Sequence, residues 1–352
     1  MTHTVGTSGE ARTQKKDVSI QALRGLAVLL MVAGHVIGTG ADRGMSVSDD
    51  SLWRLSYLVL EDIRMPLFTV ISGYVYAMRP VTETGALAGL VRGKTRRLII
   101  PLLTVGALLF ATKMLVPDTN TKPEASDFWR VYLFGYEHLW FLQSIFIIFL
   151  VVALFGVLGA LATPRRWAVT TGTTFVLFVA FRVPEAANVF SINGAIRLLP
   201  FFLIGYGLYA FASVVPRGRV LVGVTIAFAA VYMLRIAGIL GDWELNTPTR
   251  RALSLAVGVG GVLLLYSARK FIAFRWLGWI GGFSFGIYLL HVFGSAGARI
   301  ALNKFDLEWD PAVFILGLAV GIGAPIAFQL LFGRWNVVRT LVLGEKPIRS
   351  ER

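Results

Sequence analysis

Long apolar blocks, separated by short polar stretches, dominate this sequence of 352 residues. A helix needs roughly 20 apolar residues to cross a hydrocarbon core about 30 Å thick, and several blocks reach that length. Hydrophobic residues make up 56% of the chain and charged residues only 15%, whereas soluble domains are about 25% charged. Because only helices and closed barrels satisfy their backbone polar groups in lipid, the long blocks predict an integral membrane protein built from helices.

The apolar blocks predict an all-α, polytopic transmembrane helix bundle of about ten spans. The expected spans cover approximately residues 18–40, 55–78, 97–117, 139–160, 167–184, 194–212, 219–237, 250–268, 278–301 and 312–333. They form one transmembrane domain at 18–335, preceded by a polar tail at 1–17 and followed by a basic tail at 336–352.

The charges alternate from one expected loop to the next. Basic residues collect in the even-numbered loops, as at Arg96 and Arg165, and acidic residues such as Asp42 and Asp118 in the odd-numbered ones; only the fifth loop is mixed. Basic loops face the cytoplasm, so both termini are predicted to be cytoplasmic, which an even number of spans also requires. Topology therefore explains the net charge of +14. A lipid bilayer is the expected partner, and no nucleic acid is expected.

Two ionisable residues share one face of the first expected span. Arg24 and His35 are eleven residues apart, which at about 100° per residue is close to three turns, or about 16 Å along the axis. Ionisable groups inside spans are costly and usually mark function. With the N-terminus inside, Arg24 lies in the inner third of the membrane and His35 in the outer half. The alternative is an interfacial arginine and a histidine hydrogen-bonded to a neighbouring helix.

The second expected span carries Glu61, Asp62 and Arg64 at about the depth of His35. Glu61 and Arg64 are spaced i, i+3 and could neutralise each other. Alternatively, one of the two carboxylates orients the imidazole of His35, because an oriented histidine suits the role of general base. Glu61 and Asp62 are therefore candidate catalytic residues beside His35.

Basic residues also cluster where the third expected span begins. Arg96 and Arg97 follow the positive-inside rule, and they could also hold the phosphates of a nucleotide-bearing ligand, since Arg24 projects at the same side. Other cations lie near span ends, where long side chains reach the interface. They are Lys113, Arg182, Arg197, Arg235 and Arg299.

Six motifs, in order along the chain, resemble those of the membrane acyltransferase-3 family. They are QALRGLA at 21–27 with GH at 34–35, MPLF at 65–68 with SGY at 72–74, RR at 96–97 before Pro101, HLWFL at 138–142, LPFFLIG at 199–205 and SFGIYLLH at 284–291. The resemblance covers approximately residues 17–335 and is to members of the stand-alone type. The chain departs from the family pattern at Thr69 and Val70, where members often have two aromatic residues, and at Arg64, where histidine often stands.

The resemblance implies an O-acyltransferase, usually an O-acetyltransferase of sugars, in a plasma or inner membrane. Members take the acyl group from cytoplasmic acyl-CoA, generally acetyl-CoA, and modify carbohydrate on or bound for the outer face. By this resemblance His35 is the general base, and Arg24, Arg96 and Arg97 bind the donor. Residues in or beside the motifs are expected to bind the acceptor: Arg64, Ser72, Trp140 and His291.

Several alternatives remain open from the sequence. His291 could instead donate to the thioester carbonyl or satisfy a hydrogen bond in the core, and Ser72 could serve close helix packing. Transfer could be direct or pass through an acyl-histidine. The acceptor could be a small secreted metabolite such as a macrolide, and the buried charges could belong to a transporter or flippase. No metal is expected, and the chain has no cysteine to act as a thiolate ligand or nucleophile.

Overall fold

The computed structural model describes residues 17–211, 213, 215–241, 245–306 and 309–348. Every regular element within these residues is a helix, which confirms the predicted all-α class. The polar tail expected at 1–17 lies almost wholly outside the described residues, as does the end of the basic tail expected at 336–352.

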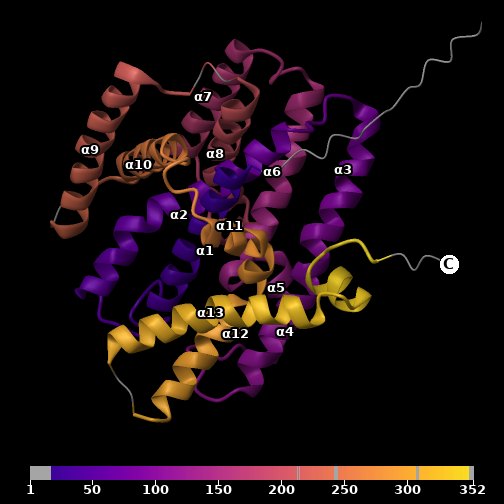
Figure 1. Cartoon of the computed structure of the whole chain (residues 1–352), viewed down its shortest axis with the longest axis vertical. Coiled ribbons are helices and arrows are strands. Elements are labelled where there is room, and N and C mark those ends of the chain that lie inside the picture. Colours follow the sequence, from indigo (N-terminus) through magenta and orange to yellow (C-terminus); the bar gives the residue numbers. More distant parts are fainter. Residues whose placement is uncertain (1–16, 212, 214, 242–244, 307–308, 349–352) are drawn as a thin grey trace, which may run out of the picture.

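Ten long helices of the described chain correspond in order to the ten expected spans (Figure 1). They are α1 (Val18–Ile37), α2 (Leu52–Ala77), α4 (Ile100–Leu115), α6 (Trp140–Val157), α7 (Pro164–Ala180), α8 (Ile192–Ala210), α9 (Gly218–Leu240), α10 (Thr247–Ser267), α12 (Ser284–Asn303) and α13 (Asp310–Phe332). Three shorter α-helices lie between them: α3 (Leu87–Lys94), α5 (Arg130–Leu133) and α11 (Arg275–Gly282).

Eight helical segments of the described residues are long and apolar enough to cross a membrane, which supports the predicted membrane bundle. The segments containing α2 and α7 are not among the eight. Helix α7 has only 17 residues, and α2 carries four charged residues within its 26. The expected cytoplasmic location of both termini stays a prediction.

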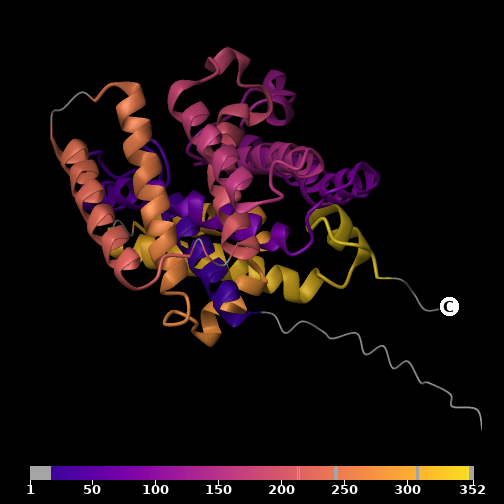
Figure 2. The ribbon, with the colours of Figure 1, turned by 90° about the horizontal axis from the view of Figure 1, so that it is seen from above.

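Helices α1, α2 and α8 form the centre of the bundle. Helix α2 packs extensively on α8, and α1 contacts α2, α11, α12 and α13. In both views α9 and α10 lie side by side at one edge of the molecule (Figures 1 and 2). Helix α9 has no buried residue within the chain although it is strongly apolar, as expected of a helix that faces lipid.

Small residues allow α2 and α8 to approach closely. A Cβ atom at Gly73 would collide with the backbone carbonyl of Phe202, and one at Gly205 would collide with the carbonyl of Val70. Such contacts are typical of membrane helix pairs, whose association depends on van der Waals packing. The close helix packing that was considered at Ser72 is therefore made by its neighbour Gly73.

The start of the third span differs from the prediction. Helical structure runs without interruption over Thr84–Leu115, so Arg96 and Arg97 lie inside it rather than in a preceding loop. They occupy a π-helical turn, Thr95–Ile99. Pro101 explains this turn, since proline lacks the N–H that an α-helix would use to bond the carbonyl of Arg97. Single π turns in helices often occur at functional sites.

The ninth expected span is divided in the structure. Helix α11 ends at Gly282, and α12 begins at Ser284. A Cβ atom at Gly281 would collide with the carbonyl of Gln21, so α11 packs directly against the start of α1. Hydropathy did not reveal the break, because both segments are apolar.

Candidate active site

Three histidines from distant parts of the chain meet in the bundle. His35 belongs to α1, His138 to the 3-10 turn Glu137–Leu139 that precedes α6, and His291 to α12. The ring centroid of His291 lies 4.8 Å from that of His35 and 4.7 Å from that of His138, and the His35 and His138 centroids are 6.1 Å apart. The three imidazoles therefore form one edge-to-face cluster.

In each imidazole, one ring nitrogen forms a hydrogen bond with a backbone carbonyl. His35 Nδ1 lies 2.9 Å from the Met31 carbonyl, His291 Nδ1 lies 2.9 Å from the Tyr288 carbonyl, and His138 Nε2 lies 3.3 Å from the Leu289 carbonyl. A carbonyl oxygen only accepts, so these nitrogens carry the proton in the neutral rings. His138 Nδ1 and His291 Nε2 have no hydrogen-bond partner among the described residues. Each ring thus keeps a basic nitrogen for other use.

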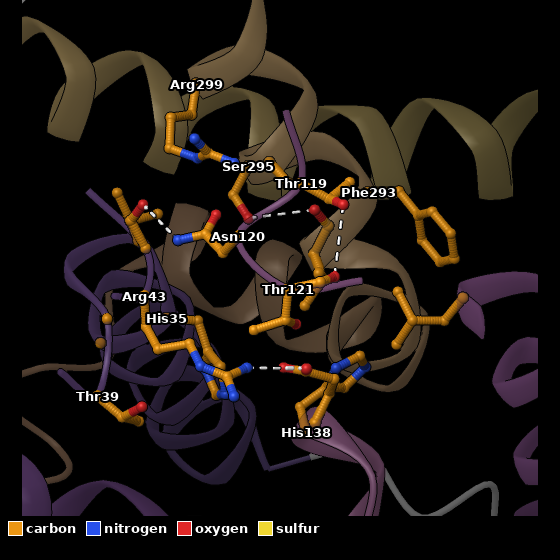
Figure 3. Close-up of a pocket in the computed structure, with 18 of the residues that line it drawn as sticks. His35, Thr39, Arg43, Thr119, Asn120, Thr121, His138, Phe293, Ser295 and Arg299 are labelled. Atoms are coloured by element: carbon orange, nitrogen blue, oxygen red, sulfur yellow. Dashed lines mark hydrogen bonds and ion pairs between the residues drawn. The ribbon is translucent and has the colours of Figure 1, made fainter. Parts of the chain in front are cut away.

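A cavity of about 950 Å³ adjoins this cluster (Figure 3). His35 and His138 lie on its wall, whereas His291 is fully buried behind them. Arg299 and Ser295 of α12 lie across the cavity from the two histidines. In the predicted topology the surrounding helix ends and loops face the outer side of the membrane.

The structure separates the two carboxylates expected to serve His35. Glu61 lines the cavity, whereas Asp62 is buried and belongs to a different contact network. Its carboxylate accepts hydrogen bonds from Arg235 Nε at 2.9 Å and from Ser254 Oγ at 2.5 Å, and Arg197 lies 3.6 Å away. The orienting contact to His35 that was considered for one of these two carboxylates is formed by neither of them among the described contacts. The Met31 carbonyl holds the ring instead.

Arg64 approaches the histidine cluster from α2. Its guanidinium lies 4.1 Å from the centroid of the Tyr57 ring and against Gly34, where a Cβ atom would collide with it. The residue lines the cavity and is only 7% exposed. No ion pair joins it to Glu61 among the described contacts, so the i, i+3 pair considered from the sequence is not formed.

The arginines expected to bind the donor lie elsewhere on the bundle, outside the lining of the cavity. Arg24 and Arg97 are close enough for their like charges to interact. The Arg97 guanidinium lies 4.0 Å from the centroid of the Phe285 ring, donates to the Leu343 carbonyl at 2.7 Å, and approaches Glu345 at 3.5 Å. The described C-terminal residues therefore pack over this basic cluster.

Comparison with protein families adds the decisive observation. The family model described as an acyltransferase domain matches residues 17–329, which is most of the 352-residue chain. The chain belongs to the acyltransferase-3 family. No curated protein and no solved structure matches it.

Sequence reasoning missed part of this acyltransferase's cavity. His138 opens the HLWFL motif but was not expected to be a site residue, and its neighbour Glu137 accepts hydrogen bonds from Arg43, at 2.9 Å, and from Lys113. Three cations assigned to the membrane interface also line the cavity. They are Lys113, Arg197 and Arg299. The HLWFL motif could have identified His138 as a site residue. Nothing in the sequence indicated that the three cations face the cavity.

Two other residues expected to bind the acceptor differ in position. Trp140 lines the cavity, whereas Ser72 does not. Ser72 Oγ donates to the Phe68 carbonyl one turn earlier in its own helix, at 3.0 Å.

Replacing Ser72 by alanine should therefore leave the steady-state constants of acyl transfer within about twofold of wild type, as is usual for changes away from a site. Trp140→Ala is the comparison variant, and it should raise the KM for the acceptor. Initial rates over a range of acceptor concentrations measure both effects. A rise in the acceptor KM for Ser72→Ala would show that Ser72 does contribute to acceptor binding.

Proposed function

We propose that this acyltransferase moves an acetyl group from cytoplasmic acetyl-CoA to a hydroxyl of a cell-surface or exported glycan, in a plasma or inner membrane. The position of His35 is the main observation that supports this proposal. Its Nδ1 hydrogen bond to the Met31 carbonyl orients the ring, and the residue lines a cavity of about 950 Å³ that also holds several charged side chains. Arg24 stands on the same helix, about 16 Å away along the axis.

The basic cluster at the other end of α1 suits a donor that carries phosphates. Arginine binds phosphate oxygens through two parallel hydrogen bonds. Arg24 and Arg97 are near enough for their like charges to interact, and Arg96 precedes Arg97 in the chain. The pantetheine arm of CoA is long enough to cover the distance between Arg24 and His35. In this arrangement α1 connects a donor site to an acceptor site.

The lone pair on His35 Nε2 is the expected base. It accepts the proton of the acceptor hydroxyl while that oxygen attacks the thioester carbonyl carbon. A C–O bond forms, the C–S bond breaks, and its electron pair leaves on the CoA sulfur, which takes up the proton from His35. General-base assistance of this kind contributes about 10²–10⁴ in rate.

The function is tested with membranes that contain the protein and acetyl-CoA labelled in the acetyl group. Label should pass from the coenzyme to a glycan, and an excess of unlabelled acetyl-CoA should abolish the incorporation. Membranes without the protein provide the background. Mass spectrometry of surface glycans, with and without the protein, then identifies the modified product. A protein that moves glycans but leaves the thioester intact would be a transporter or flippase instead.

The donor site makes a separate kinetic prediction. Arg24→Gln should raise the KM for acetyl-CoA by about tenfold or more, because a hydrogen bond to a charged phosphate contributes about 1.5–3 kcal/mol. Arg92→Gln is the matched control, since Arg92 is an exposed arginine on neighbouring α3 and should leave the KM unchanged. Initial rates with varied acetyl-CoA measure the effect. A change confined to the KM of the acceptor would contradict the assignment of Arg24 to the donor.

A further inference from the structure

The cavity beside His35 and His138 has an excess of positive charge. Two acidic residues, Glu61 and Glu137, belong to its lining. The basic side chains in the lining are Arg43, Arg64, Lys113, Lys122, Arg197 and Arg299. Neither the thioester nor a neutral sugar hydroxyl carries a charge that would require so many cations.

Two of the three acidic groups in or beside the lining are already engaged, whereas Glu61 has no ion pair among the described contacts. Glu137 accepts hydrogen bonds from both Arg43 and Lys113. The dashed line from Arg43 in Figure 3 marks the first of these bonds. Asp62 lies outside the lining and approaches Arg197 at 3.6 Å, but its closer contact, at 2.9 Å, is with Arg235. Arg43 also approaches Asp42, at 3.5 Å. The lining itself still has six basic residues against Glu61 and Glu137, so it keeps an excess of positive charge.

Arg64 is the most distinctive of these cations. It is only 7% exposed, its guanidinium lies over the Tyr57 ring, and it forms no ion pair with a carboxylate among the described contacts. A buried charge without a counter-charge is costly, and more so at membrane depth. Its position against Gly34 places it beside His35, where an acceptor hydroxyl must lie during transfer.

We infer that the acyl acceptor is itself anionic and that Arg64 binds its negative group while His35 receives the proton of its hydroxyl. The anion is either a carboxylate on the sugar or the phosphate that joins a sugar to its carrier, since a guanidinium forms paired hydrogen bonds with both. Arg197 and Arg299 add a favourable field at the cavity wall. This inference rests on the proposed function and names the chemical class of its acceptor.

Binding to the purified protein tests the inference without the donor. Methyl glucuronide and methyl glucoside differ mainly in the carboxylate, and glucose 1-phosphate supplies the phosphate. Calorimetric titration should show that methyl glucuronide or glucose 1-phosphate binds about 10- to 100-fold more tightly than methyl glucoside, the ratio expected for hydrogen bonds to a charged group. The stronger of the two anions identifies the source of the negative group.

Arg64→Gln should remove this preference and leave the weak binding of methyl glucoside unchanged. Arg64→Lys should keep part of the preference for anions, because lysine retains the positive charge but lacks the planar, paired N–H donors of the guanidinium. Arg250→Gln, an exposed arginine at the start of α10, is the matched control and should bind like wild type. Retained binding of methyl glucoside shows that the variants are folded.

Three results would overturn the inference. If the wild-type protein binds charged and neutral sugars equally, or binds neither, the cavity does not select anions. An unchanged preference for anionic sugars in Arg64→Gln would show that another residue binds the anion. Adenosine 3′,5′-bisphosphate is the nucleotide portion of CoA. If Arg64→Gln no longer binds it, Arg64 belongs to the donor site instead. Acetyl transfer is measured separately, so transfer without anion preference refutes only this inference, and anion preference without transfer refutes only the proposed function.

Discussion

Replacing His35 by alanine is expected to abolish acyl transfer while the protein remains inserted in the membrane. The change removes the base, so the rate should fall by about 10²–10⁴, the usual contribution of general-base assistance. His138 and His291 are unable to replace it fully. Their ring centroids lie 6.1 and 4.8 Å from that of His35, and His291 is completely buried.

The measurement is the rate of acetyl incorporation per mole of membrane-inserted protein, with the thermal unfolding midpoint as a test of folding. Leu29→Ala is the control on the same helix, because Leu29 is only partly buried and does not line the cavity. Its rate should stay within about twofold of wild type, as for most substitutions away from a site. A His35→Ala protein with near wild-type transfer would refute the proposed mechanism.

The same preparation distinguishes direct transfer from an acyl-histidine intermediate. Rapid quenching after addition of labelled acetyl-CoA, without acceptor, should leave the wild-type protein unlabelled if the hydroxyl attacks the thioester directly. Label on wild type that is absent from His35→Ala would instead show that His35 is the nucleophile.

The spacing of Arg24 and His35 was informative because helix geometry is local. Side chains eleven residues apart share a face whatever the rest of the chain does, and the structure places Arg24 near Arg97 and His35 at the cavity. Hydropathy likewise predicted the ten long helices, since an apolar block has few other stable arrangements in lipid. These features needed no knowledge of tertiary contacts.

The histidine cluster was beyond this kind of reasoning. His35, His138 and His291 are separated by more than a hundred residues at each step, and only tertiary packing brings α1, α12 and the turn Glu137–Leu139 together. Hydropathy also reports the depth of a cation but not the direction in which it points. Lys113, for example, lies near a span end and yet reaches Glu137 in the cavity lining.

Asp62 shows the same limit at a single residue. Neighbouring positions on a helix point about 100° apart, so Glu61 and Asp62 had to face different surroundings, and the sequence of α2 alone does not say which one faces His35. The structure turns Glu61 to the cavity and Asp62 toward α9 and α10. Asp62 is therefore expected to stabilise the fold rather than to act in transfer.

Asp62→Ala should lower the free energy of unfolding by about 3–5 kcal/mol, the usual effect of removing one partner of a buried ion pair. Asp62 is 4% exposed, and its loss would leave Arg235, whose side chain is 14% exposed, without its carboxylate. The unfolding midpoint of the purified protein in detergent measures the change. Asp50→Asn, in the exposed loop before α2, is the control and should leave the midpoint unchanged.

The double variant Asp62→Ala/Arg235→Ala separates the cost of the unpaired arginine from the loss of packing. Removing the unpaired charge should restore part of the stability lost in Asp62→Ala, because the two residues are directly coupled. The turnover number per folded protein should stay near that of wild type in both variants, since Asp62 does not touch His35. A large fall in turnover with an unchanged unfolding midpoint would show instead that Asp62 orients the base during transfer.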